Sequence, residues 1–343
     1  MPEIPIQNVY YLLCYAWGHM REGEIVEAGA TGRTKLANLF AQVLVNGTRR
    51  VLRQGLDRGY VTRSEDMSRL RGRVELSTSI QRALLPRAQA HCRYGTLSQD
   101  VIHNRILKST MRHLARTEEL DGDLRDGLTR LVRRFRNVRD VPLRRSLFRR
   151  VQLHSNNAFY RFLMNVCALV EQNLVVEEGG EGRRFRDFRK DDAQMGALFE
   201  RFVRRFYEHE QNRYRVSAPH IRWDLDSPAP SHLPSMQTDV VLQSNGRTII
   251  IDTKYYARTL QSHHGTQSYH SANLYQLFAY LKNAEAKSSA FEEAEGLLLY
   301  PTVAISLDEA FRVQGHEVRL RTLNLAQDWV GISNDLLAFA GCR

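Results

Sequence analysis

The sequence has few cysteines, few lysines and no long hydrophobic segment. Its four cysteines are far apart and form no Cys-x-x-Cys pair, which argues against a disulfide scaffold and a cysteine zinc site. This cysteine usage suits a reducing cytosol, so we expect a cytoplasmic protein. No stretch approaches the ~20 apolar residues of a membrane-spanning helix, so we expect no membrane partner.

Several common catalytic signatures are also missing. The chain has no Walker A sequence and no Gly-x-Gly-x-x-Gly loop, so we expect it to hydrolyse no nucleotide itself. It has no Gly-x-Ser-x-Gly elbow, which argues against a serine hydrolase of that kind. His263, His264 and His270 lie in one polar segment but form no His-x-His or His-x3-His ligand pair. A polar loop near DNA is therefore a better interpretation of this segment than a histidine-metal nuclease.

Arginine dominates the charged residues that are present. The 343 residues carry a formal net charge of +11, and only six of the cations are lysines. Arginine suits bidentate contacts with phosphate, and a basic chain of this size suggests a polyanionic partner. The alternative is chance basicity, since many soluble proteins are basic. The length is enough for two domains with cores of their own.

The stretch "TDVVLQSNGRTIIIDTKYY" predicts a β-hairpin with charges at its ends. Asn245-Gly246, between two apolar runs, is typical of a type I′ turn in which both residues have positive φ. A two-residue turn fixes the register, so opposed residues are those equally far from the turn. Asp239 then opposes Asp252, and Lys254 projects from the same face because side chains alternate along a strand.

Two carboxylates in this position require a compensating cation. Directly opposed side chains have Cβ atoms ~5 Å apart, and like charges there destabilise a sheet and raise a carboxyl pKa. Mg²⁺ takes carboxylate oxygens while it keeps several waters, and a neighbouring lysine can hold a phosphate oxygen or an attacking water. The alternative is an Asp–Lys surface pair at a frayed hairpin end. The run "RTIIID" argues against it, because such an apolar run is typical of a central strand.

The pattern of Asp239, Asp252 and Lys254 resembles the signature of the PD-(D/E)xK nucleases, with Thr238 where the family name has proline. The resemblance implies that the two acids bind Mg²⁺ and that the lysine assists the attacking water. It also implies an α/β fold in the C-terminal part, with a mixed sheet flanked by helices in the order αβββαβ. The expected elements are a helix at 193–210, a strand at 213–223, the hairpin at 238–256, a helix at 270–283 and a strand at 296–301.

The helices on both sides of the hairpin offer further candidates. Glu200 lies on the flank of an apolar stripe, where the resemblance implies a further metal ligand or orienting acid. The alternative is an ion pair with Arg204, one helical turn away. Gln276 and Tyr280 resemble the Gln-x3-Tyr element of RecB-like nucleases, which implies that they orient the site or contact DNA. The alternative is a surface glutamine beside an amphipathic tyrosine.

The N-terminal half carries no catalytic motif. Residues 59–76 mix short strand patterns with turn residues, which indicates a protruding hairpin or a small barrel-like region. Residues 92–115 go from a strand to a helix with Asp100 as its expected N-cap. Residues 121–150 are predicted to be helical and rich in arginine, which indicates a solvated helix face more than a dedicated DNA groove.

Five stretches spread along the chain carry a wider resemblance: "IPIQNVYYLLCYAWG", "RGRVEL", "HNRILKST", "FYRF" and "TDVVL…IIIDTKYY…NLYQL…GLLLYP". With them the chain as a whole resembles the McrC family, the nuclease subunits of McrBC modification-dependent restriction systems. The resemblance implies a Mg²⁺-dependent endonuclease that cuts double-stranded DNA in complex with a McrB-like AAA+ GTPase ring, which binds the GTP and recognises modified cytosine. It implies a partner-binding α+β domain at residues 1–150 and a nuclease domain at residues 151–343.

The resemblance also implies that the N-terminal region enters the pore of the ring and stimulates its GTPase. We place this contact in residues 59–76, with Arg71 and Arg73 as candidates to touch the GTPase. The alternative is an ordinary hairpin with solvated arginines. Two other functions stay open: a non-catalytic adaptor of a ring NTPase, whose acids are structural, and a free-standing restriction or repair nuclease.

Overall fold

The computed structural model describes residues 4–20, 35–154, 157–176, 183–255, 261–263, 266–301 and 306–342. The chain forms two compact units, which we call the sheet unit and the arm unit. The sheet unit consists of Met1–Gly23 with Asp187–Arg343, and the arm unit consists of Glu24–Arg186. The functional division that we predict at residue 150 is a different boundary and stays a prediction.

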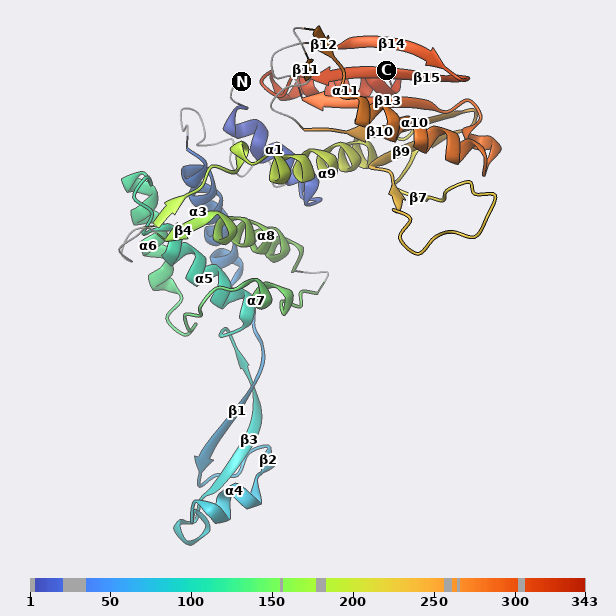
Figure 1. Cartoon of the computed structure of the whole chain (residues 1–343). Helices are drawn as coiled ribbons and strands as arrows, with labels where there is room; N and C mark the ends of the chain where they lie inside the picture. The colour runs from blue at the N-terminus through green and yellow to red at the C-terminus, as the bar shows by residue number, and fades with distance from the viewer. Residues whose placement is uncertain are drawn as a thin grey trace. The chain divides into compact units, whose positions relative to one another are not determined.

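The sheet unit is built on a six-stranded mixed sheet in the order β14-β15-β13-β10-β9-β6 (Figure 1). Strand β13 runs parallel to β10 and to β15, and the other neighbours are antiparallel. The predicted central strand is confirmed, because β10 lies inside the sheet and only its first residue is not buried. The strands are β6 Arg215–Ser217, β9 Val240–Ser244, β10 Arg247–Thr253, β13 Glu295–Pro301, β14 Asp308–Val313 and β15 His316–Leu323, and two short pairs are β7 His220–Ile221 with β8 Met236–Gln237 and β11 Gln261–His263 with β12 Thr266–Ser268.

Helices flank this sheet, as predicted. Helix α10 packs on β10 and β13, where Leu277, Tyr280 and Leu281 share a core with Ile250 and Leu298. Helix α9 packs on β9 and β10 and buries its predicted apolar stripe. Among the elements that form or cover this sheet, α9, β6, β9, β10, α10 and β13 come in this order along the chain, with the short pairs β7–β8 and β11–β12 between them. The helices are α1 Ile6–Ala16, α9 Asp192–Glu210, α10 Ser271–Glu285 and α11 Trp329–Ala340, with 3₁₀ turns η4 Phe188–Lys190 and η5 Ser289–Phe291.

Helix α1 is fixed to the C-terminal half of the chain by buried contacts. The Asn8 side-chain amide donates hydrogen bonds of 2.8 Å to the carbonyls of Leu325 and Gln327. The Tyr15 ring meets the Phe202 ring of α9 edge-on, with the centroids 5.8 Å apart. Satisfied buried hydrogen bonds and aromatic pairs are costly to break. The first helix of the chain is therefore part of the core of the sheet unit.

The predicted register of the hairpin is confirmed. The five ladder pairs run from the turn to Val240 opposite Ile251, and both residues of each pair are equally far from the turn. The type I′ assignment is wrong, because Gly246 has a positive φ of 86° and Asn245 does not. Type II turns need positive φ only at their second central residue. A two-residue loop of this kind keeps the register without straining the asparagine.

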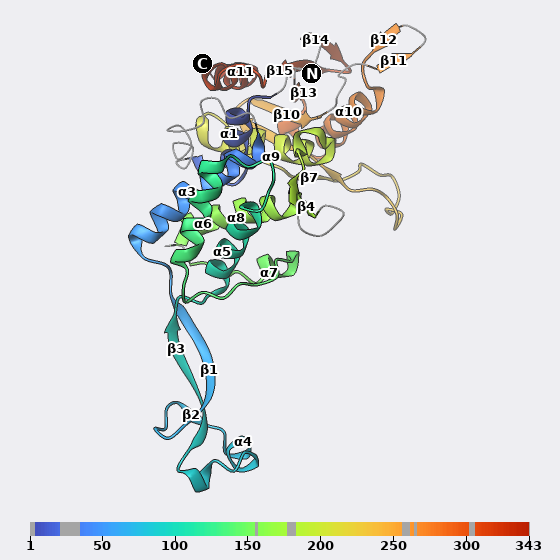
Figure 2. The same ribbon diagram turned by 90° about the vertical axis from the view of Figure 1, so that its left-hand side faces the viewer.

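The arm unit consists of packed helices and a long two-stranded arm that projects from them (Figures 1 and 2). Strands β1 and β3 pair antiparallel over nine residues each, and β2, α4 and η2 lie at the far end of the arm. The prediction of a protruding hairpin or a small barrel-like region within residues 59–76 is only partly right. This segment does project, but β1 pairs with β3 at residues 90–98, and α4 begins at Leu76. The elements are α3 Leu36–Gln54, β1 Gly59–Met67, β2 Arg73–Val74, α4 Leu76–Gln81, η2 Leu85–Arg87, β3 Ala90–Ser98, α5 Ile102–Leu114, α6 Gly122–Arg134, α7 Arg145–Arg149, α8 Ala158–Asn173, β4 Leu174–Val176 and β5 Arg183–Phe185.

Two local predictions in the arm unit are wrong. Residues 121–150 do not form one helical stretch, because α6 ends at Arg134 and α7 begins at Arg145. Asp100 does not cap α5, whose N-cap makes no side-chain hydrogen bond. Its carboxylate instead binds Arg139, in the segment between α6 and α7. This ion pair is one of several contacts that hold the non-helical segment between α6 and α7. Among the helices of the described ranges, none is both long enough and apolar enough to cross a membrane.

Gly296 in β13 allows α10 to lie close to the sheet. A Cβ atom at this position would lie 2.9 Å from Leu277 Cδ2 and 3.0 Å from Leu281 Cδ1. We expect Gly296→Ala to overpack the contact and to lower the free energy of unfolding by about 1–3 kcal/mol. Thermal unfolding followed by circular dichroism measures the change.

The matched control is Gly196→Ala in α9. Its Cβ atom would meet Tyr255 Cβ at an ordinary 3.6 Å. Alanine favours a helix interior over glycine, so we expect an equal or higher Tm. A Gly296→Ala protein as stable as this control would show that α10 does not depend on the close approach.

Candidate active site

Asp252 lies at the C-terminal end of β10, and only 1% of it is exposed. The Lys254 ammonium is 3.1 Å from its Oδ1 and 2.8 Å from its Oδ2. The contact with Oδ2 is an ion pair without the direction of a hydrogen bond, and Oδ2 accepts no hydrogen bond from the described residues. The central strand therefore ends in a buried carboxylate that is only partly satisfied.

Asp239 directly precedes β9, one position beyond the last ladder pair, on the strand opposite Asp252. Its Oδ2 accepts two hydrogen bonds of 2.8 Å from Thr253, one from the backbone N–H and one from the hydroxyl. Oδ1 is the oxygen that Thr253 does not hold. Our sequence interpretation missed Thr253 as a positioning residue, although a hydroxyl beside the second acid was a usable signal.

Burial dominates the electrostatics of the site. The pKa of Asp252 is raised to about 7, chiefly because the carboxylate is removed from water. The Lys254 cation lowers this pKa, and the carboxylates of Asp239 and Glu200 raise it. Lys254 alone therefore does not compensate the buried charge. A divalent cation would favour the ionised form of Asp252.

A chain of hydrogen bonds holds Lys254 in place. Its ammonium donates to Gln276 Oε1 at 3.0 Å, and Gln276 Nε2 donates to the Tyr280 hydroxyl at 2.6 Å. That hydroxyl donates to the Gln237 carbonyl at 3.0 Å. Tyr280 is buried, and burial raises its pKa, so it stays a neutral donor. The two α10 residues singled out from the sequence thus meet the lysine of the hairpin.

The position of Glu200 fits part of each interpretation made from the sequence, which are an acid of the metal site and an ion pair with Arg204. Its carboxylate lies 3.6 Å from the Arg204 guanidinium, which is the i,i+4 ion pair. Burial raises the pKa of Glu200, and the Asp239 carboxylate raises it further. Arg204 also donates to the Asp239 carbonyl at 3.4 Å. Glu200 therefore borders the two acids, and its role as a metal ligand stays a prediction.

The acids present fit a hard cation that keeps water in its coordination shell. No group of three or more His, Cys, Asp or Glu side chains in the described ranges could hold a metal ion. Mg²⁺ does not need such a cage, because it binds one or two carboxylates together with waters and substrate phosphates. Asp239 and Asp252 supply two carboxylates, and Asp252 Oδ2 accepts no hydrogen bond from the described residues, so these acids fit such a cation. His264 and the side chain of His263 lie outside the described residues.

Arg71 and Arg73 lie at the far end of the arm, in the other unit. Arg71 stacks over the Tyr94 ring, 4.6 Å from its centroid, and Arg73 begins β2 opposite Arg93. Gly72 between them has a φ of 69°, and a Cβ atom there would lie 2.4 Å from the Arg93 carbonyl oxygen. Glycine therefore lets this turn approach β3, and the turn presents two exposed cations. Their contact with a partner stays a prediction.

A family model and a curated relative each match most of this chain. The family model of the McrBC 5-methylcytosine restriction system component matches residues 7–301. The type IV methyl-directed restriction enzyme EcoKMcrBC of Escherichia coli K12 is 30% identical over 339 residues, which are 98% of this chain and 97% of that protein.

Two solved structures are also similar. One is a half-complex of Thermococcus gammatolerans McrB AAA+ hexamers with bound McrC, with a TM-score of 0.62, 18% identity, and coverage of 99% of this chain and 76% of that chain. The other is a Thermococcus gammatolerans McrBC complex, with a TM-score of 0.44, 23% identity, and coverage of 62% of this chain and 60% of that chain. The first likeness shows a shared fold.

Asp252→Asn removes a charge that folding must bury. Because the folded-state pKa of Asp252 is raised to about 7, the native protein holds an extra proton between the usual and the raised pKa. Its stability therefore falls as the pH rises through that interval. We expect the variant to have the higher Tm at about pH 8 without divalent cations, and to lose this advantage near about pH 5.

Thermal unfolding of both proteins at the two pH values measures the difference. Asp224→Asn is the control, because Asp224 is exposed and pairs with Lys287 at the surface. Its effect on Tm should be small and equal at both pH values. Equal stability of the native protein and Asp252→Asn at the higher pH would mean that Lys254 compensates the buried charge fully.

Proposed function

This chain belongs to the family of McrBC 5-methylcytosine restriction system components, and we propose that it is the subunit that cuts DNA. We propose a Mg²⁺-dependent endonuclease of the PD-(D/E)xK type, acting on double-stranded DNA in the cytoplasm. It works in a complex with a McrB-like AAA+ GTPase ring, which binds the GTP.

One observation carries the catalytic part of the proposal. The buried Asp252 carboxylate, the Asp239 carboxylate and the Lys254 ammonium meet at the end of a central strand. Perturbed acids of this kind are concentrated at functional sites, because a fold gains no stability from them. The order of α9, three strands, α10 and β13 supports a PD-(D/E)xK core around these residues.

The chemistry follows from the positions of the side chains. Asp239 and Asp252 would hold Mg²⁺, which polarises a phosphate and lowers the pKa of bound water when present. Lys254, held between Asp252 and Gln276, would orient the attacking water or stabilise charge on the phosphoryl oxygens. Tyr280 fixes Gln276 and so fixes the lysine. Glu200 would orient the water near Asp239, since no group of three His, Cys, Asp or Glu side chains in the described ranges could hold a metal ion.

The arm unit supplies the partner contact in this proposal. The related Thermococcus gammatolerans half-complex contains McrB AAA+ hexamers with bound McrC. We assign the contact with such a ring to the far end of the arm, where Arg71 and Arg73 would touch the GTPase and stimulate it. In this proposal the residues that contact the partner lie within 1–150 and the residues that cut DNA lie within 151–343.

Asp252→Asn and Asp239→Asn should each abolish DNA cleavage. We expect the rate with partner, GTP and Mg²⁺ to fall by at least about a hundredfold, because one charged metal ligand is lost. Stimulation of the partner GTPase should stay unchanged, since the arm is untouched. Gel-based cleavage and phosphate release measure the two activities.

Asp224→Asn, a surface change, is the control and should cut normally. Undiminished cutting by Asp252→Asn would refute the site. GTPase stimulation without cutting, by both the native protein and the variant, would indicate the non-catalytic adaptor. Cutting by the purified chain with Mg²⁺ alone would indicate the free-standing nuclease.

Gln276→Ala should slow cleavage through Lys254. Loss of the 3.0 Å contact frees the ammonium, and we expect a single-turnover rate roughly tenfold lower with an unchanged Mg²⁺ requirement. Tyr280→Phe should have a smaller effect in the same direction. Ser271→Ala, at the exposed start of α10, is the control. A normal rate for Gln276→Ala would assign Gln276 to the surface.

A further inference from the structure

A basic cleft lies at the root of the arm, inside the arm unit. Its volume is about 800 Å³. Its lining comes from the root of β1, the end of β3 and the segment after α6, and we call this last segment the wall after α6. Its charged lining consists of four arginines and two carboxylates: Arg58, Arg63, Arg136, Arg139, Glu65 and Asp100.

Asp100 fixes the wall after α6. Its carboxylate accepts hydrogen bonds from the Arg139 backbone N–H at 2.9 Å and from Arg139 Nε at 2.7 Å. It also accepts from Arg105 Nε at 2.6 Å and Nη2 at 2.8 Å. Burial acts to raise the pKa of Asp100, but these arginines hold it at about 2. Asp100 therefore stays ionised and is fully engaged within the protein.

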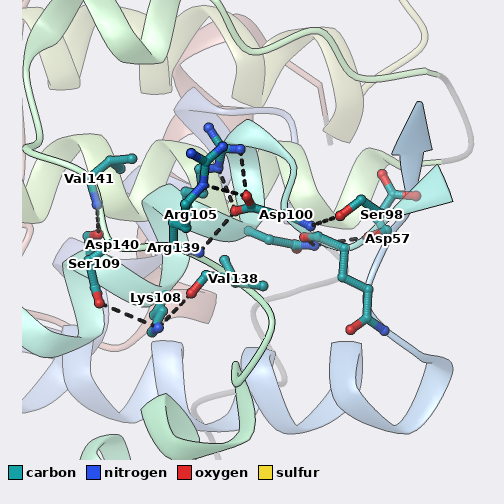
Figure 3. Close-up of polar contacts among 12 residues, drawn as sticks. Asp57, Ser98, Asp100, Arg105, Lys108, Ser109, Val138, Arg139, Asp140 and Val141 are labelled. Carbon is teal, nitrogen blue, oxygen red and sulfur yellow. Dashed lines mark hydrogen bonds and ion pairs between the residues drawn. The ribbon is translucent and has the colours of Figure 1, made fainter. Parts of the chain in front are cut away.

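Two further buried groups hold the same wall (Figure 3). The buried Lys108 ammonium donates to the Val138 carbonyl at 2.6 Å, and the Val141 N–H donates to Ser109 Oγ at 3.0 Å. Lys108 also lies 3.4 Å from the Asp140 carboxylate. Side chains of α5 thus anchor residues 138–141, in the non-helical segment between α6 and α7. The cleft is preorganised and does not depend on a ligand for its shape.

The guanidinium groups of the cleft arginines are accessible to a ligand. Arg58, Arg63 and Arg136 are exposed, and their guanidinium groups make no ion pair with a described carboxylate. Arg139 is held through its Nε while 71% of its side chain stays exposed. Hydroxyl and amide groups stand beside them in the lining, from Thr62, Ser64, Ser98, Gln99 and Asn137. Together these groups form a concave surface of hydrogen-bond donors with excess positive charge.

We propose that this cleft, which belongs to a different unit from the acids that cut, binds phosphate groups of the DNA backbone. The proposal rests on the proposed function, since it names a second contact of the same substrate. Guanidinium groups bind phosphate in bidentate fashion, and hydroxyls and amides are the usual further donors to the backbone.

Other hollows of the arm unit are also basic. One is lined by Arg49, Arg53 and Arg134, and another, which shares Arg58 with the main cleft, includes Arg150 and His154. An extended polyanion can contact several basic hollows, whereas a single small anion occupies only one. The described lining of the main cleft contains no aromatic residue, so it lacks the Trp and Tyr anchors that are common at protein–protein interfaces.

Equilibrium binding in the Asp252→Asn background tests the proposal, because binding is then read without cutting. We use the full chain and a fluorescent, unmodified duplex of about 30 base pairs, and measure anisotropy at about 50 and 200 mM KCl. Arg58→Ala, Arg63→Ala and Arg136→Ala should each weaken binding roughly fivefold. The triple variant should reduce the slope of log affinity against log salt by about 2–3.

Arg116→Ala is the matched control. Arg116 is exposed, belongs to the same unit and lies outside the cleft, so affinity and slope should be unchanged. The triple variant should keep the parent Tm, because its arginines have no described ionic partner. An affinity and salt slope equal to those of the parent would refute the cleft as a DNA site.

The same variants distinguish a DNA site from two alternatives, a site for free phosphates and a protein interface. Inorganic pyrophosphate or GTP that displaces the duplex at micromolar concentration, and only when the arginines are present, would make the cleft a site for free phosphates. Loss of binding to the GTPase ring by the triple variant, with unchanged DNA affinity, would make it a protein interface. Either result would overturn the proposal, whereas failure of cleavage alone would leave these binding measurements valid.

Discussion

A carboxylate that must stay buried at the end of a central strand is the constraint on which the sheet unit depends. Asp252 is 1% exposed, and its pKa of about 7 shows that Lys254 does not fully compensate the charge. The hairpin register adds the Asp239 carboxylate to the same place, which increases the cost. Gln276 and Tyr280 restrain the lysine and keep it beside the acids. A sequence selected only for stability would place apolar groups here, which supports our proposal that these charged groups bind a cation and a phosphate.

The site could be predicted from the sequence as far as local geometry determines it. A two-residue loop and the alternation of a strand were enough to place Asp239 across from Asp252. The turn type could not be fixed, because several turns close a loop of that length. The hydrogen bonds from Thr253 to Asp239, and from Lys254 to Gln276, depend on rotamers and on how closely α10 approaches the sheet. Those distances are set by packing and leave no signal in residue spacing.

The arm unit shows the limit of local patterns more clearly. The composition of residues 121–150 favours helix, yet the middle of this segment follows contacts with Asp100 and Lys108, which lie far away in the sequence. A short-range propensity of a few tenths of a kcal/mol per residue is easily outweighed by buried ion pairs and hydrogen bonds. The absence of helix in the middle of this segment also changes where its arginines lie. A solvated helix face would present them to bulk water, whereas the anchored segment presents Arg136 and Arg139 to a cleft.

The two compact units do not correspond to two consecutive halves of the chain. Helix α1 belongs to the sheet unit, so the arm unit is an insertion between Gly23 and Asp187. A functional boundary at residue 150 would therefore not coincide with a boundary between the two compact units. A chain that began at residue 151 would lose α1 and expose Phe202, which packs against Tyr15 in the complete protein. It would also leave the carbonyls that bind Asn8 without their donor. The N-terminal residues are thus part of the scaffold that supports α9 and, through α9, the hairpin with its two acids.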